Sequence, residues 1–256
     1  MDILQSALLG IVEGVTEFLP ISSTGHLILA ADILRVAQTD FTKSFEIIIQ
    51  LGAIASVIFL YWKILWNLET IKKLAVAFIP TGIIGLLLYK IVKTYLLGNE
   101  TIVLWSLFLG GLALIIFERR HNEDNSNIDS IKAISYKQAA LIGLFQAIAI
   151  IPGVSRSAAT IVGGLSLGIK RSTIVEFSFL LAVPTMLAAS GLDLMKNYSV
   201  LLSPDKFWLL ATGFIVSFIV ALGSIKFLLR YIQKHNFTPF GIYRIFAALL
   251  FWMIVL

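Results

Sequence analysis

Residues 13–26, EGVTEFLPISSTGH, and residues 152–160, PGVSRSAAT, interrupt two apolar regions of the chain, Leu4–Ile33 and Ala139–Ile169. A transmembrane helix needs about 20 mostly apolar residues, and the segment on each side of an interruption is too short to cross a bilayer alone. Because a proline stands at each break beside serine and threonine, each region is predicted to form a re-entrant hairpin of two half-helices. Broken backbone is tolerated at membrane depth only where protein or a water-filled cavity surrounds it.

The rest of the chain has the composition of an integral membrane protein. Of its 256 residues, 58% are hydrophobic and 14% are charged, and the mean hydropathy is +0.92. Soluble domains have roughly 45–50% apolar and about 25% charged residues. We therefore predict an all-α, polytopic membrane protein, with residues 1–256 forming one integral membrane domain. The six predicted spans are Ser44–Trp62, Leu74–Val92, Thr101–Phe117, Ser172–Met195, Phe207–Ile225 and Phe240–Leu256.

Composition also excludes several chemistries. The chain has no cysteine, which excludes disulfides and thiolate metal sites, and its three histidines make an all-histidine metal site unfavourable. The net charge of +5 does not indicate nucleic-acid binding, because the Lys and Arg residues lie in short connectors between apolar stretches. The N-terminal sequence MDILQSALLG has neither a basic n-region nor a small-residue cleavage site, so it is interpreted as a retained segment.

The two halves of the chain, about 1–117 and 133–256, resemble each other at an offset of 132 residues. FEIIIQLGAIAS in the first half is similar to FSFLLAVPTMLAAS in the second. The matched pairs are Pro20 and Pro152, Ser23 and Ser155, and Phe45 and Phe177. The polar stretch Glu118–Lys137 between the halves is predicted to be a solvated loop.

Charge predicts the orientation. With the 63–73 connector on the cytoplasmic side, the inner connectors collect thirteen Lys and Arg residues and the outer connectors six, which is the bias expected for this orientation. The inner residues are Lys63, Lys72, Lys73, Arg119, Arg120, Lys132, Lys137, Lys170, Arg171, Lys226, Arg230, Lys234 and Arg244, and the outer ones are Arg35, Lys43, Lys90, Lys93, Lys196 and Lys206. Three spans then separate the hairpins. They enter from opposite sides as an inverted repeat, with both tips near the midplane.

Two carboxylates precede the first break. Glu13 and Glu17 are four residues apart, which places both on one face of a helix. Like charges this close in an apolar setting resist double ionisation, so one is protonated or a cation lies between them. Such a pair can bind a divalent metal or act as a general base. The alternative is a helix end at the membrane interface with both carboxylates solvated.

Hydroxyl and imidazole groups follow at the first break. Ser22 or Ser23 is expected to cap the outgoing half-helix, and Thr24 adds a third hydroxyl. His26 lies three residues after Ser23, so their side chains are neighbours on a helix. A serine beside a base is the minimal arrangement for nucleophilic attack.

The second break combines a helix start with an arginine. Ser155, Arg156 and Ser157 are predicted to form the first turn of a half-helix, with Thr160 on the next turn. Helix N-termini attract anions, and arginine donates to phosphate oxygens in a bidentate manner. The alternative is that Arg156 only neutralises Glu13 or Glu17 across the repeat interface. If the N-termini of both half-helices point at one site near the midplane, that site suits an anion. A separation of Arg156 from Glu17 beyond about 15 Å would exclude a ligand shared by the two residues.

The two motifs together resemble the bacterial undecaprenyl-diphosphate phosphatase family, which is known for bacitracin resistance. FEIIIQLG and EFSFLLAVPTM also resemble the helices that flank these motifs in that family, and the likeness covers nearly the whole chain. The resemblance implies hydrolysis of a polyprenyl diphosphate lipid, undecaprenyl diphosphate, to the monophosphate, which recycles the lipid carrier of cell-wall synthesis. It also implies the bacterial plasma (inner) membrane, a site facing its outer side, and a divalent cation such as Mg²⁺ or Ca²⁺.

The resemblance carries roles over by position. Glu13 and Glu17 match the acidic motif of the family, Ser23 and His26 match its SSTGH motif, and the residues of the second motif match Ser155, Arg156, Ser157 and Thr160. In the resulting hypothesis Arg156 holds the diphosphate, the two glutamates hold the metal or one activates the nucleophile, Ser23 attacks and His26 handles its proton. A water activated by the carboxylates is the alternative nucleophile. The family usually has Gly where this chain has Ala158, a change we do not expect to abolish activity.

A different class of function fits part of the pattern. Inverted repeats with broken helices at the midplane are typical of transporters, so a polyprenyl-phosphate flippase, or a protein with both activities, is the main alternative. A transporter does not need paired carboxylates beside a serine and a histidine. An anion channel fits poorly, because two carboxylates would repel the ion. Glu46, Gln50, Gln146 and Glu176 are expected to make interhelical hydrogen bonds, and a homodimer is left open.

Overall fold

The computed structural model describes residues 1–96, 99–123, 126–201 and 204–255, and its regular elements are helices. In chain order they are α1 (Ile3–Thr16), α2 (Ser23–Ile33), α3 (Asp40–Leu65), α4 (Leu68–Ile91), the π-helix η1 (Val92–Leu96), α5 (Glu100–Arg120), the 3₁₀-helix η3 (Ile131–Ala133), α6 (Tyr136–Ala147), the 3₁₀-helix η4 (Ile148–Ile150), α7 (Arg156–Ser166), α8 (Arg171–Leu201), α9 (Pro204–Tyr231) and α10 (Thr238–Val255). The all-α prediction is confirmed.

Among the described residues, five helices are long and apolar enough to cross a bilayer, and they coincide with the first five predicted spans. Each helix is longer than the span predicted for it, for example 40–65 in α3 against the predicted 44–62. The sixth predicted span falls on α10, and the stretch Thr238–Met253 of this helix belongs with the shorter apolar helices. The chain is therefore a multi-pass membrane protein.

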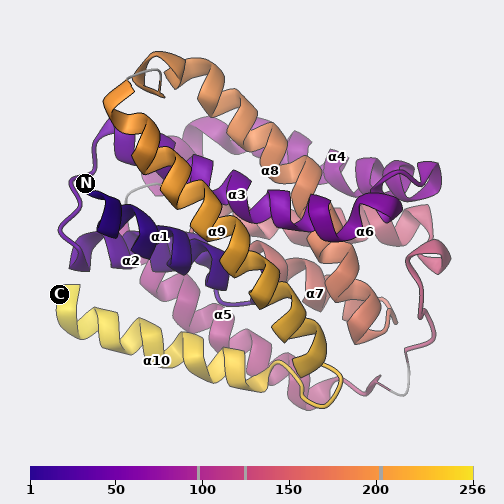
Figure 1. The fold of residues 1–256 in the computed structure, drawn as a ribbon. Helices are drawn as coiled ribbons and strands as arrows, with labels where there is room; N and C mark the ends of the chain where they lie inside the picture. The colour runs from indigo at the N-terminus through magenta and orange to yellow at the C-terminus, as the bar shows by residue number, and fades with distance from the viewer. Residues whose placement is uncertain (97–98, 124–125, 202–203, 256) are drawn as a thin grey trace.

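The two predicted hairpins are present as pairs of short helices, α1 with α2 and α6 with α7 (Figure 1). Each pair packs on a long helix of the other half of the chain: α1 lies along α9, and α6 lies along α4. The central contact is α3 against α8, and α5 lies beside α10 at the bottom of the view. Each half therefore closes over the hairpin of the other.

Close approach at small residues permits these hairpin contacts. A Cβ atom added to Gly143 of α6 would lie 1.8 Å from the Ala77 carbonyl oxygen of α4, and one added to Gly14 of α1 would lie 2.7 Å from the Ser217 carbonyl oxygen of α9. Membrane helices commonly meet through such small residues, because dispersion contacts increase as the backbones approach. Glycine at these two positions thus fixes where each hairpin sits.

The main hydrophobic core surrounds α8. Of its most apolar stretch 56% is buried, against 17–33% in the other four candidate spans, so α8 is the central helix. Phe179 of α8 packs edge-on against Phe18 in the first break, with ring centroids 5.3 Å apart. The core therefore reaches directly to the broken backbone.

The polar stretch 118–137 differs from the predicted solvated loop. Helix α5 continues to Arg120, and Ile131 and Ile134 are buried in the main core. Glu118 is buried because it pairs with the Arg171 guanidinium and accepts a hydrogen bond from the Phe237 backbone N–H at 3.1 Å. The prediction of a solvated loop was wrong for these residues, because the polar composition gives no sign of the buried ion pair or of the two core isoleucines. Residues 124–125 lie outside the described part.

Candidate active site

Both breaks contain a serine in a left-handed backbone conformation. Ser22 has φ 73° and ψ 94°, and Ser155 has φ 72° and ψ 111°. Such conformations cost roughly 1–3 kcal/mol in a non-glycine residue and concentrate at functional sites. The two serines are 133 residues apart (155 − 22), one residue more than the predicted offset of 132 between the halves. Ser22, and not Ser23, is therefore the counterpart of Ser155.

The two serines cap their helices differently. Ser155 accepts a hydrogen bond from the Ala158 backbone N–H at 3.2 Å, and it therefore caps α7. Ser22 stands at the N-cap of α2 but makes no side-chain capping bond, and the Ser23 hydroxyl bonds elsewhere. The predicted serine cap of the first hairpin was therefore wrong, which leaves a hydroxyl available for another role.

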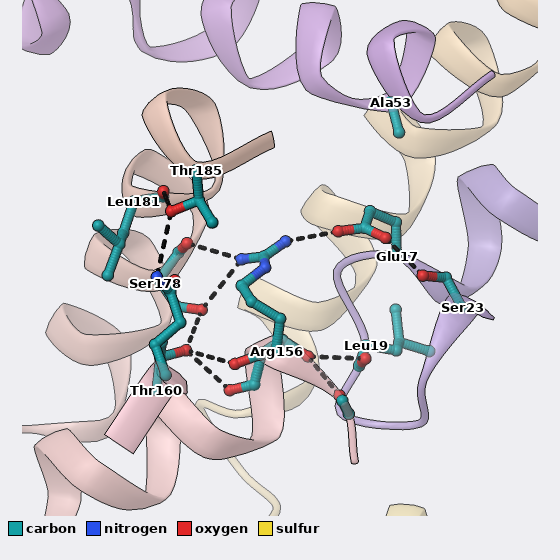
Figure 2. Close-up of polar contacts among 12 residues, drawn as sticks. Glu17, Leu19, Ser23, Ala53, Arg156, Thr160, Ser178, Leu181 and Thr185 are labelled. Atoms are coloured by element: carbon teal, nitrogen blue, oxygen red, sulfur yellow. Dashed lines mark hydrogen bonds and ion pairs between the residues drawn. The ribbon is translucent and has the colours of Figure 1, made fainter. Parts of the chain in front are cut away.

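A chain of hydrogen bonds joins the two breaks through Arg156 (Figure 2). The Arg156 Nη2 atom lies 2.7 Å from Glu17 Oε1, far inside the limit set for a shared ligand, and the ion pair is nearly buried. The Ser23 hydroxyl donates to Glu17 Oε2 at 2.5 Å. The guanidinium is held on its other side by Nη1, which donates to the Ser178 carbonyl oxygen of α8 at 2.8 Å. Arginine, carboxylate and serine therefore form one connected unit.

One donor of the arginine is left over. The Nε atom of Arg156 is buried and has no hydrogen-bond partner among the described residues. Leaving a charged donor unsatisfied in a buried place is costly. The guanidinium carbon also lies 6.0 Å from the centroid of the Phe18 ring. The arginine is thus fixed in position and still able to donate to an acceptor.

A cavity of about 270 Å³ lies beside this unit. Its polar lining from the first hairpin comes from Glu17, Ser22, Ser23 and Thr24, and the second hairpin contributes Pro152, Gly153, Ser155 and Arg156. Ala149 and Ile150 of the second hairpin and Met186 and Ala189 of α8 add apolar walls. The first turns of α2 and α7 therefore face one cavity, as the sequence predicted.

Four of the predicted site residues do not line this cavity: Glu13, His26, Ser157 and Thr160. The Ser157 hydroxyl donates to the Leu19 carbonyl oxygen at 2.8 Å and so holds the first break. The Thr160 hydroxyl lies 2.6 Å from the Ser178 hydroxyl and 3.0 Å from carbonyl oxygens of its own helix. These two hydroxyls fix the surroundings of Arg156, and nothing in the geometry directs them at a ligand.

Glu13 is wholly buried in α1, and among the described residues no donor hydrogen-bonds to either of its carboxylate oxygens. Its electrostatic neighbours are Glu17, Glu46 and Arg156. The structure describes no cluster of three or more His, Asp or Glu side chains arranged for a metal ion. A buried carboxyl without a partner beside a second carboxylate nevertheless suits a cation, since burial of an unpaired charge is costly.

His26 is held away from Ser23. Its Nδ1 atom lies 2.8 Å from the Ser22 carbonyl oxygen, which can only accept, so Nδ1 carries the proton. Its Nε2 atom lies 2.8 Å from the Tyr243 hydroxyl of α10. Both ring nitrogens are therefore engaged, and the hydrogen-bond partner of Ser23 is Glu17. The histidine connects the strained Ser22 to α10.

Arg244, the next residue of α10, was missed by the sequence reasoning, which counted it among the inner connectors. It is fully buried and donates to backbone carbonyl oxygens of both breaks. Those acceptors are Pro20 at 3.4 Å, Gly153 at 3.0 Å and Val154 at 3.1 Å, with Ser106 at 2.9 Å and Leu107 at 3.3 Å on α5. An arginine inside the predicted span 240–256 was the available signal. Without Arg244, the inner connectors hold twelve Lys and Arg residues and the outer connectors six. The side chains of two of the outer residues, Lys93 and Lys196, lie outside the described residues.

Gly110 of α5 makes room for this arginine. We expect Gly110→Ala to displace Arg244, because the new Cβ atom would lie 2.0 Å from its Nη2 atom and 2.8 Å from its Cζ atom. Overpacking at such a site costs about 1–3 kcal/mol and here also loosens both breaks. The measurement is thermal unfolding of the purified protein in detergent. The matched control is Gly223→Ala, where nothing lies within 4 Å of the added atom; equal unfolding temperatures for the two variants would contradict the role of Arg244.

The fold and the site together define a polytopic membrane protein in which two broken helices line one cavity that holds a buried arginine–carboxylate pair, with a serine hydrogen-bonded to the carboxylate. The chain belongs to the family of bacitracin resistance protein BacA, which it matches over residues 6–250. It is 52% identical over 254 residues to an undecaprenyl-diphosphatase of Sulfurihydrogenibium sp., covering 99% of both chains. It is also 51% identical to that of Wolinella succinogenes, covering 98% of this chain and 97% of the other, and 48% identical to that of Aquifex aeolicus, covering 96% of each.

Proposed function

We propose that this protein hydrolyses undecaprenyl diphosphate to undecaprenyl phosphate and inorganic phosphate, and thereby recycles the lipid carrier of cell-wall synthesis. The observation that carries the proposal is a cavity lined by Arg156, Glu17 and Ser23, in which the serine hydroxyl already donates to Glu17 Oε2 at 2.5 Å. Phosphate oxygens are the acceptors that a fixed guanidinium suits best. The names of relatives that match nearly the whole chain support the same reaction.

The chemistry that the cavity supports begins at Ser23. In the serine route its Oγ atom attacks the terminal phosphorus, the bond from that phosphorus to the bridging oxygen breaks, and the bridging oxygen leaves on undecaprenyl phosphate. The serine proton passes to Glu17 Oε2, the acceptor it already contacts at 2.5 Å. Water then cleaves the phosphoserine to inorganic phosphate and restores the hydroxyl. In the alternative route a water takes the place of the serine oxygen.

Arg156 acts as the fixed positive charge. Because two of its nitrogens are held by Glu17 and Ser178, the guanidinium needs no reorganisation when negative charge develops on the transferred phosphoryl group. Its Nε–H is the donor left for that group. The apolar walls formed by Ile150, Met186 and Ala189 suit the first isoprene units of the lipid.

A divalent cation, Mg²⁺ or Ca²⁺, is part of the proposal. Glu13 and Glu17 would hold it, because Glu13 has two buried oxygens without hydrogen-bond donors among the described residues. Carboxylate oxygens are the ligands that both Mg²⁺ and Ca²⁺ prefer, so the two glutamates would suit either ion. When bound, the cation supplies positive charge that offsets the charge of the diphosphate.

Removal of the cation tests this part. We expect purified protein in detergent to release phosphate from undecaprenyl diphosphate, to lose at least about 90% of that activity with excess chelator, and to recover it with Mg²⁺ or Ca²⁺. Glu13→Gln should need a higher cation concentration for half-maximal activity, because it replaces one anionic ligand. The readout is released inorganic phosphate. Full activity after exhaustive chelation would exclude a required metal, and no phosphate release under any condition would refute the phosphatase itself.

The placement of the protein is proposed as the bacterial inner membrane with the cavity open toward the outer side. The charge bias of the connectors supports this orientation even after Arg244 is removed from the count. The reciprocal packing of α1 on α9 and α6 on α4 supports an inverted repeat and favours a second activity, translocation of the lipid. Lipid translocation in vesicles by a variant that cannot hydrolyse its substrate would establish that second activity.

A further inference from the structure

Gln146 of α6 lines the same cavity as Arg156, Glu17 and Ser23. Its Nε2 atom donates to Thr81 Oγ1 of α4 at 2.9 Å and to Thr185 Oγ1 of α8 at 3.1 Å. Thr185 lies seven residues after Ser178 on α8, which corresponds to about 10 Å along the helix axis. The glutamine thus stands about two helical turns away from the residue that holds Arg156.

The hydrogen bonds of the two threonines determine how the amide is turned. The Thr81 hydroxyl donates to the Gly143 carbonyl oxygen at 2.7 Å, and the Thr185 hydroxyl donates to the Leu181 carbonyl oxygen at 2.8 Å. Carbonyl oxygens only accept, so each hydroxyl proton is already engaged and each hydroxyl can only accept from Gln146. Nitrogen must therefore face the threonines, and the amide cannot be flipped without losing both bonds.

This orientation leaves the Gln146 carbonyl oxygen without a partner. Its Oε1 atom is buried and accepts no hydrogen bond from the described residues, although the side chain is 99% buried in a polar cluster. A buried acceptor that stays unsatisfied costs free energy, so a donor is expected to fill the place. The cavity is the available source of that donor, since Gln146, Thr81 and Thr185 all line it.

The position has a counterpart in the first hairpin. Gln146 stands nine residues before the left-handed Ser155 (155 − 146), and Glu13 stands nine residues before the left-handed Ser22 (22 − 13). Both side chains are almost fully buried, and both carry oxygens that accept no hydrogen bond from the part of the chain that the structure describes. Glutamate in one place suits a cation, whereas the neutral amide in the other suits an O–H donor.

We propose that Gln146 Oε1 is a binding site for an O–H donor in the cavity, either a water molecule or the hydroxyl of a phosphate group. The proposal rests on the proposed function, because both donors are reactants or products of phosphate-ester hydrolysis. The interhelical hydrogen bonds expected for Gln146 from the sequence are present, and they hold the amide with its nitrogen on the two threonines.

The test is Gln146→Met, which keeps the size of the side chain but removes the acceptor. Phosphate release from undecaprenyl diphosphate should show kcat/KM lowered about fivefold to tenfold, as expected for one lost hydrogen bond. Two further readouts separate the donors. With methanol as a competing nucleophile, a changed ratio of methyl phosphate to inorganic phosphate identifies water; weakened inhibition by added inorganic phosphate identifies the phosphate hydroxyl. The exposed Gln233→Met is the matched control.

A purely structural role for Gln146 predicts a different result. It would lower the unfolding temperature but leave the product ratio and phosphate inhibition at their wild-type values, and that result overturns the proposal. If Gln146→Met does not fold, Thr185→Val replaces it; this variant frees the amide to rotate and should change the same readout in the same direction. Because wild-type activity is measured in the same assay, failure of the proposed hydrolysis is seen separately from failure of this site.

Discussion

Arg156→Ala is expected to lower phosphate release from undecaprenyl diphosphate by about 100- to 1000-fold or more, the usual effect of removing a fixed donor from a developing negative charge. The Arg156 guanidinium donates from Nη2 to Glu17 and from Nη1 to the Ser178 carbonyl oxygen, and its buried Nε has no partner among the described residues. Its removal also leaves Glu17 buried without its counter-charge, which adds to the loss.

Arg156→Lys separates charge from geometry. A lysine ammonium is a point charge and lacks the planar fork, so it cannot reach both Glu17 and Ser178 and still direct a third donor at the phosphate. We expect only partial activity, measured as kcat/KM for phosphate release. Arg230→Ala, which removes an exposed arginine at the end of α9, should behave as wild type. A lysine variant as active as wild type would argue against the role of the fork.

Much of the fold could be predicted because apolar length alone specifies a membrane span. The first five predicted spans coincide with helices, and prolines at positions 20 and 152 mark the two breaks. The structure brings Glu17 of the first motif to Arg156 of the second, a contact 139 residues apart in sequence. The inverted repeat predicted that the two breaks share one site, whereas the direct ion pair of Arg156 with Glu17 was the stated alternative, in which the arginine neutralises a buried carboxylate.

The details that sequence did not reveal depend on backbone conformation. Nothing in SSTGH shows that Ser22 adopts a positive φ, and this residue sets which hydroxyl faces Glu17 and which carbonyl group holds His26. The role of Arg244 depends on five carbonyl groups from three separate segments, which only the folded chain brings together. These five carbonyl groups cannot be recognised in the sequence, in which the only sign of the site is one arginine within an apolar stretch.

Ser23→Ala discriminates the two nucleophiles. If the serine oxygen attacks phosphorus, its removal should lower kcat by about a thousandfold or more, because the route is lost and only binding and electrostatic stabilisation remain. If a water attacks, the same variant loses one hydrogen bond to Glu17, and kcat should fall by no more than about tenfold. We expect the larger loss, since the hydroxyl already donates to a carboxylate at 2.5 Å inside the cavity that holds Arg156.

Chemical trapping of the phosphoserine intermediate tests the same choice of nucleophile directly. Acid quenching of the wild-type reaction with substrate labelled in the terminal phosphate should yield labelled protein, and the label should be absent from Ser23→Ala. Ser166→Ala, an exposed serine of α7, is the matched control and should retain both label and turnover. Near-complete turnover by Ser23→Ala would rule out serine attack, and Glu17 would then be the base for a water, because it would keep its ion pair with Arg156 and its place in the cavity.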